Sequence, residues 1–203
     1  MKLQLHGIDW VQFLLVCVGT AATWGIATRQ VRAQSNVSAI SQTSQELTLL
    51  FRESQADHSP KDGKSTDWAE VTLRDEARLA RVKELYVTDQ LQTGEDLDRA
   101  AMILQNSTAP EDYLLAHELC VVAISKGFDA KWLAAAAEDR FLTSIGRPQR
   151  FGTQYRSDGT GMHLLEVDSS VTDGLRRTLA VPSLADAKAY EAMLNGGKAK
   201  QDR

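Results

Sequence analysis

The sequence predicts a mainly α protein, either an antiparallel helical bundle or an array of αα-hairpins, with a small β-hairpin near residues 150–168. Three observations predict this class. Apolar residues recur near a 3.6-residue period through most of residues 68–145. Gly127 separates two of these helical stretches by a very short loop, which makes the two helices antiparallel neighbours. A period of two replaces the helical period only after Gly146.

The composition is that of a globular domain, since 43% of the 203 residues are hydrophobic and 25% are charged. These proportions exclude a collagen-like chain, a disulfide-rich scaffold and a mostly disordered polymer. A net charge of −4, from 23 basic and 27 acidic residues, is too small to attract nucleic acid or an anionic bilayer. We therefore expect no nucleic-acid partner, and membrane contact only through an uncleaved N-terminal segment.

A strongly apolar segment, residues 10–27, lies close to the N-terminus. Small side chains suitable for signal peptidase follow it and end at Ala33, so we predict that residues 1–33 are a signal peptide and that the protein is periplasmic or secreted. Arg29 and Arg32 follow the segment, and positive charge there opposes translocation. The alternative is a membrane anchor formed by residues 10–27, whose length is near the lower limit of about 17 residues for a spanning helix.

Residues 34–67 are rich in Ser, Gln, Thr and Asp, and we predict that they form a mostly irregular linker. One short helix is expected within it over residues 44–51, with Ser44 as the N-cap and Leu47 on its apolar face. The structured domain is predicted to begin at residue 68 and to end at residue 194.

The first two helices of this domain are predicted over residues 68–91, with Asp67 as the N-cap, and over residues 96–105. Gly94 lies between them. The long helix is amphipathic, and its basic side chains are expected to face solvent, namely Arg74, Arg78, Arg81 and Lys83.

A third helix, residues 110–126, is apolar nearly all round and is predicted to be the central buried helix. Ser107 or Thr108 would cap it, with Pro110 in its first turn.

The fourth helix is predicted over residues 130–145, with Asp129 as its cap and Gly146 as its stop. Its alanines at positions 134–137 would let a neighbouring backbone approach closely. We place Trp68 and Trp132 in the core, since both stand at amphipathic helical positions.

After Gly146, alternation at residues 151–155 and a strand-like run at 162–167 predict the hairpin. Two further helices are expected at residues 171–179 and 184–194. Residues 195–203 are predicted to be a disordered tail.

One passage is more specific than these patterns. It consists of Asp139 and Arg140 followed by the run from Gly146 to Gln154, and it resembles an uncharacterised bacterial domain family whose helical region ends in a DR…GxPQx(Y/F)GTQ signature. The matching residues are Asp139, Arg140, Gly146, Pro148, Gln149, Gly152, Thr153 and Gln154, while Phe151 stands where tyrosine is usual. The resemblance covers roughly residues 68–185. It implies a domain type and candidate positions but no mechanism.

The paired helices with alanines at close contacts also look like tetratricopeptide-type repeats, although no second copy recurs at a fixed period near 34 residues.

Asp139 and Arg140 interrupt the small-residue helix just before this glycine-containing segment. Their first interpretation is structural, because an aspartate there can accept backbone N–H bonds from the hairpin and an arginine can bind a carbonyl or carboxylate. The alternative is a pocket for a polar ligand, in which Arg140, Gln149, Thr153 and Gln154 bind and Asp139 or His117 is the catalytic candidate.

His117 precedes Glu118, but residue 121 is valine, so the H-E-x-x-H zinc motif is absent. We interpret His117 as a partly buried, hydrogen-bonded histidine, with a base or a metal ligand beside His163 as the alternative. The sequence contains neither a phosphate-binding glycine loop nor a G-x-S-x-G nucleophile motif. We predict no metal and no cofactor.

These observations leave two hypotheses for function. The first is an exported, noncatalytic module of the cell envelope that binds a protein or peptide partner. The second is a hydrolase-type enzyme with a polar pocket around Asp139, Arg140 and Gln154, in which Asp139 or His117 is the general base.

Overall fold

The computed structural model describes residues 42–59 and 66–196. The predicted signal peptide or anchor lies outside the described residues. The chain divides into two units between Gln42 and Thr43; the first lies almost wholly outside the described residues, and the second is described below. Within the described ranges, no helix combines the length and the apolar character needed to cross a bilayer.

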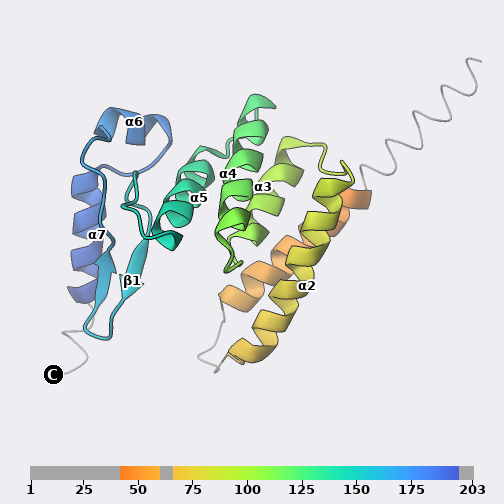
Figure 1. The fold of residues 1–203 in the computed structure, drawn as a ribbon, viewed down its shortest axis with the longest axis horizontal. Helices are drawn as coiled ribbons and strands as arrows, with labels where there is room; N and C mark the ends of the chain where they lie inside the picture. Colours follow the sequence, from red (N-terminus) through yellow and green to blue (C-terminus); the bar gives the residue numbers. More distant parts are fainter. Residues whose placement is uncertain (1–41, 60–65, 197–203) are drawn as a thin grey trace, which may run out of the picture. The chain divides into compact units, whose positions relative to one another are not determined.

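The described chain is mainly helical with one small antiparallel sheet, which confirms the predicted fold class (Figure 1). A helix over residues 42–58 comes first. The elements that follow are α2 (Trp68–Val87), α3 (Gly94–Leu104), α4 (Pro110–Ser125), α5 (Lys131–Ser144), β1 (Tyr155–Ser157), β2 (Met162–Leu164), α6 (Asp173–Thr178) and α7 (Leu184–Gly196).

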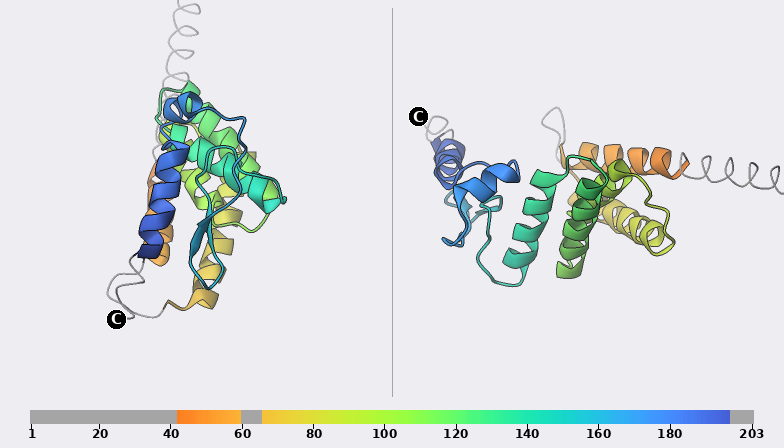
Figure 2. Two further views of the ribbon diagram at one scale, coloured as in Figure 1. Left: turned by 90° about the vertical axis from the view of Figure 1, so that its left-hand side faces the viewer. Right: turned by 90° about the horizontal axis from the view of Figure 1, so that it is seen from above.

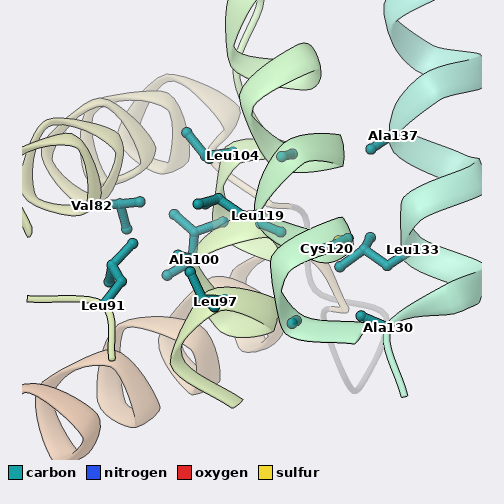
Figure 3. Close-up of a cluster of buried hydrophobic side chains, with 14 of the residues drawn as sticks. Val82, Leu91, Leu97, Ala100, Leu104, Leu119, Cys120, Ala130, Leu133 and Ala137 are labelled. Atoms are coloured by element: carbon teal, nitrogen blue, oxygen red, sulfur yellow. The ribbon is translucent and has the colours of Figure 1, made fainter. Parts of the chain in front are cut away.

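The helices α3, α4 and α5 pack side by side in chain order, with α4 in contact with both of the others (Figure 2). Their apolar faces form the main core together with α2 and the helix over residues 42–58 (Figure 3). Ala134 to Ala137 of α5 are all buried. The fully buried side chains of this core include Leu47, Val82, Leu85, Leu104, Cys120 and Ala137.

The prediction that α4 is buried all round is wrong for its outer face. Ala116, Leu119, Cys120 and Ala123 are buried, but Val121 is half-exposed. A helix packed between two neighbours in a single layer still has a face that neither neighbour covers, and apolar residues occupy that face here.

The prediction of a mostly irregular segment before residue 68 is wrong for residues 42–58. The short helix expected at residues 44–51 is present and extends to residue 58. Leu47 is fully buried, and Leu50 and Phe51 pack against the same core. The helix is stable because its apolar face packs into the core that it shares with α2 and the later helices, a tertiary contact that local composition does not encode.

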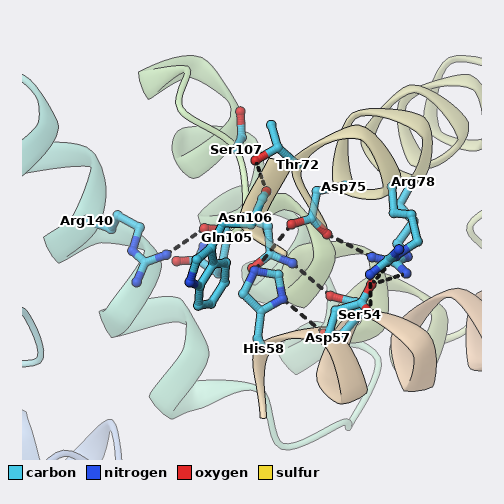
Figure 4. A network of polar contacts seen from close by, with 12 residues as sticks. Ser54, Asp57, His58, Thr72, Asp75, Arg78, Gln105, Asn106, Ser107 and Arg140 are labelled. Atoms are coloured by element: carbon cyan, nitrogen blue, oxygen red, sulfur yellow. Dashed lines mark hydrogen bonds and ion pairs between the residues drawn. The ribbon is translucent and has the colours of Figure 1, made fainter. Parts of the chain in front are cut away.

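Ion pairs reinforce the contact between this helix and α2. Arg78, which was expected to face solvent, is only 4% exposed and pairs with Asp75 at 2.9 Å and Asp57 at 2.6 Å (Figure 4). Arg74 binds both carboxylate oxygens of Asp57, at 2.9 and 3.0 Å. The hydrogen bond from Arg74 holds the pKa of Asp57 below its usual value, and the bond from Arg78 acts in the same direction. His58 completes the cluster, 3.2 Å from Asp75.

The predicted helix caps are only partly present. Asp67 caps α2 by accepting bonds from the backbone N–H groups of its first turn. The N-cap of α4 is Ala109, not Ser107 or Thr108, and the N-cap of α5 is Ala130, not Asp129; neither makes a side-chain capping bond.

The prediction that two tryptophans lie in the core is also wrong. Trp68 is 57% exposed and Trp132 is 49% exposed. Both stand in the first turn of a helix, and the core position of that turn is taken by a neighbour, Val71 or Leu133.

The C-terminal part forms a second, smaller apolar cluster from Ala135, Phe151, Val171 and Val181. The strands of the hairpin are shorter than predicted, because residues 151–154 form a loop and only Tyr155–Ser157 pairs with Met162–Leu164. The side chain of Asn195 binds the backbone N–H and the carbonyl of Met162, both at 2.8 Å. Asn195 therefore belongs to the fold, against the predicted disordered tail; residues 197–203 lie outside the described residues.

Replacing Gly94 by alanine is expected to lower the free energy of unfolding by roughly 1–3 kcal/mol, the usual cost of overpacking. A Cβ at this first residue of α3 would lie 2.5 Å from Cβ of Phe128 and 3.3 Å from the Ala123 carbonyl oxygen. Cβ of Phe128 cannot move without its backbone. Urea unfolding followed by circular dichroism measures the change.

The matched control for Gly94→Ala is Gly174→Ala in α6, where the nearest atom to an added Cβ is 3.7 Å away. We expect the control to unfold within about 0.5 kcal/mol of the parent. A Gly94→Ala variant as stable as the control would contradict the close packing of α3 against Phe128.

Candidate functional site

Asp139 of α5 holds the backbone of the loop at residues 149–154, which we call the 149–154 loop. The carboxylate is fully buried. Its Oδ1 accepts bonds from the N–H groups of Arg150 and Phe151, at 2.7 and 2.9 Å. Its Oδ2 accepts bonds from the N–H and the hydroxyl of Thr153, at 3.0 and 2.8 Å. These are the backbone N–H bonds that the structural interpretation of Asp139 predicted.

A buried arginine binds the carbonyl groups of the same loop. Arg176 of α6 is 2% exposed; it donates from Nε to the Phe151 carbonyl at 3.1 Å and from Nη2 to the Arg150 carbonyl at 3.0 Å. Its Nη1 binds the carbonyl of Val171 at 2.8 Å and the carboxylate of Asp173 at 3.0 Å. The carboxylate of Asp139 therefore binds the N–H groups of the loop, and the guanidinium of Arg176 binds its carbonyl groups.

Gln149 bridges the loop internally. Its fully buried amide donates to the carbonyls of Gln154 and Leu165, at 3.0 and 2.9 Å, and accepts from the N–H of Gln154 at 2.8 Å. These bonds fix the path of the backbone from residue 149 to residue 154. The side-chain nitrogen of Gln154 donates to the carbonyl of Ala136 at 3.3 Å and to the hydroxyl of Thr153 at 3.0 Å.

Arg140 follows Asp139 on α5 and points to a different side. Its Nε donates to Oε1 of Gln154 at 3.2 Å. Its Nη1 donates to the carbonyl of Gln105 at 2.5 Å (Figure 4). Its guanidinium carbon lies 5.8 Å from the ring centre of Tyr113. Burial lowers the pKa of Arg140, and no described carboxylate lies within 4.0 Å of the guanidinium.

A groove of about 490 Å³ opens beside this arginine. Its volume falls within the range of ligand sites, about 300–1,000 Å³. Residues from the helix over 42–58, from α3, α5 and α7, and from the hairpin line it: Gln55, Met102, Gln105, Asn106, Trp132, Leu133, Ala136, Arg140, Thr153, Gln154, Tyr155, Met162, Tyr190 and Leu194.

The structure divides the predicted site residues into two groups. Arg140, Thr153 and Gln154 line the groove. Asp139 and Gln149 are fully buried, do not belong to the lining and hold the 149–154 loop.

The two histidines singled out from the sequence do not line the groove. His117 is partly buried, and its Nδ1 lies 2.9 Å from the carbonyl oxygen of Ala134, as the structural interpretation predicted. His163 lies on β2 near Asp158 and Glu191, at 3.3 and 3.4 Å. Among the residues that the structure describes, no three His, Cys, Asp or Glu side chains are grouped so that they could bind a metal ion.

Sequence reasoning missed the aromatic residues of the groove. Tyr155 and Tyr190 meet edge to face, with ring centres 5.6 Å apart, and Trp132 lines the same groove. Sequence reasoning also missed Arg176. Arg177 is next to it, and the sequence does not indicate which of these two arginines is buried. The position of Trp132 in the first turn of its helix was a weak indication that its side chain is exposed.

Comparison of the chain with protein-family models, with curated proteins and with solved structures found no match. The resemblances to the signature family and to tetratricopeptide repeats therefore stay predictions.

Proposed function

We propose that the protein is a noncatalytic module that binds a peptide segment of a partner protein in the groove beside Arg140. The observation that carries the proposal is the lining of this groove, which combines three exposed or partly exposed aromatic side chains with one arginine. Tyrosine, tryptophan and arginine are the residues most enriched at the energetic centres of protein interfaces. The apolar segment at residues 10–27 supports a partner in the cell envelope.

The hydrolase alternative has less support from the side chains that could carry chemistry. Both oxygens of Asp139 are occupied by bonds from the 149–154 loop. His117 does not line the groove. Cys120 is buried, and burial raises the pKa of its thiol to about 12, so it stays protonated and weakly nucleophilic at neutral pH.

Affinity selection from a synthetic library of random octapeptides, with the full chain as bait, tests the proposal. We expect peptides that bind with micromolar dissociation constants by fluorescence anisotropy. Trp132→Ala is expected to weaken them at least about tenfold, as loss of a central aromatic contact does.

Trp68→Ala is the matched control, because Trp68 is equally exposed but lies on α2 outside the groove. We expect it to bind within about twofold of the parent. Failure to select any peptide, or equal effects of the two tryptophan substitutions, would contradict the proposed function.

A further inference from the structure

We infer that Arg140 binds a carboxylate of the peptide, so that the groove selects a segment that places a negative charge beside an apolar or aromatic residue. This inference rests on the proposed function and adds the chemistry of the partner.

The first support is the charge of the groove. Arg140 is the only charged residue among the described residues that line it, and the lining contains no aspartate or glutamate. A guanidinium stays protonated in proteins. The groove therefore presents one positive charge with no anion beside it, in surroundings that water only partly reaches. A carboxylate binds such a charge through charge-assisted hydrogen bonds, and it is the anion that an unmodified peptide carries.

The second support is the number of donors left for a ligand. A guanidinium carries five N–H groups. Those of Arg140 bind two acceptors among the described residues, the side chain of Gln154 and the carbonyl of Gln105. Its Nη2 has no protein acceptor in the described part of the chain. These two fixed bonds, with the Tyr113 ring beside the guanidinium, hold its plane in place for a ligand.

The third support is an unpaired donor nearby. The side-chain nitrogen of Gln105, another residue of the groove lining, is buried and has no hydrogen-bond partner in the described structure. A buried donor without a partner costs free energy that a bound acceptor recovers. Gln105 is therefore a second residue of the lining with a hydrogen-bond donor that the described structure leaves unused.

The apolar part of the ligand follows from the remaining lining. Trp132, Tyr155 and Tyr190 are exposed or partly exposed and form an aromatic surface in the same groove. An apolar or aromatic side chain next to the carboxylate would cover this surface, which a free small anion would leave in water.

Binding of the selected peptides and their neutral forms to the parent protein tests the inference without any protein variant. Each peptide is compared with a C-terminally amidated form and with forms in which Asp or Glu is replaced by Asn or Gln. We expect one of these changes to weaken binding at least about tenfold. An effect of amidation identifies the chain terminus as the source of the carboxylate, and an effect of the amide replacements identifies an acidic side chain.

A double-mutant cycle then assigns the charge to Arg140. Arg140→Gln should raise the dissociation constant of the acidic peptide at least about tenfold. The dissociation constants of the neutral peptide for this variant and for the parent protein should agree within about twofold. Arg156→Gln is the control, since Arg156 is exposed on β1 and does not line the groove. Circular dichroism confirms that both variants are folded.

The outcomes separate the two proposals. If no peptide binds, the proposed function fails. Suppose that Trp132→Ala weakens peptide binding, but every neutral peptide binds the protein as tightly as the acidic peptide from which it was made. The proposed function then stands, and the carboxylate inference is overturned. The same holds if Arg156→Gln weakens binding as much as Arg140→Gln does.

Discussion

Asp139→Ala is expected to lower the free energy of unfolding by about 3 kcal/mol, the upper part of the range for leaving buried polar groups unpaired. The substitution removes the acceptor for three backbone N–H groups and one hydroxyl of the 149–154 loop. The bond to the Phe151 N–H is buried and the other three are partly buried, so water replaces the lost carboxylate poorly. Urea unfolding at neutral pH, followed by far-ultraviolet circular dichroism, measures the change.

Asp129→Ala is the control for this substitution, because Asp129 is exposed and its nearest described cation is 3.9 Å away. We expect it to unfold within about 0.5 kcal/mol of the parent. An unchanged or raised midpoint for Asp139→Ala would reverse the structural interpretation, since removal of a functional side chain is often neutral or stabilising.

Arg176→Met is also expected to lower the free energy of unfolding by about 3 kcal/mol, which is the lower part of the range for breaking a buried charged network. Methionine fills the space of the aliphatic stem but leaves the carbonyls of Arg150, Phe151 and Val171 without their donors. The adjacent Arg177→Met is the control, because Arg177 is exposed on the same short helix. Equal stability of the two variants, measured by urea unfolding, would contradict the role assigned to Arg176.

The helices from α2 to α5 could be predicted from the sequence because each has its own periodicity, and α4 and α5 also have a glycine just beyond their ends. α5, for example, ends at Ser144 before Gly146, and α4 ends at Ser125 before Gly127. The role of Asp139 could be predicted for a related reason. A charged residue within an alanine-rich helix, close in sequence to a loop with free N–H groups, has few other partners.

Contacts between distant segments could not be predicted in this way. The burial of Arg78 depends on Asp57, which lies in a segment expected to be irregular. The helix over residues 42–58 depends in turn on the α2 surface that it covers. The local sequence of the helix over residues 42–58 and that of α2 do not indicate this contact. The ion pair and the apolar contact form only when both segments are in place, and each then stabilises the other.

Only part of the groove lining could be predicted from the sequence. Arg140, Thr153 and Gln154 were candidates because they belong to the signature passage, but that passage did not distinguish groove residues from the buried Gln149 and Asp139. The aromatic lining comes from three separate places along the chain, the start of α5, β1 and α7. Only the tertiary fold brings Trp132, Tyr155 and Tyr190 to one surface.

The most direct measurement of the central claim is an NMR titration of the full chain, labelled with ¹⁵N, that follows the Nε–Hε signal of Arg140. Arg140→Lys assigns the signal by its disappearance. A selected acidic peptide is predicted to shift this signal with the same dissociation constant as fluorescence anisotropy gives, while its neutral form leaves it in place. A peptide that binds with that dissociation constant but leaves the Arg140 signal unmoved would contradict the account.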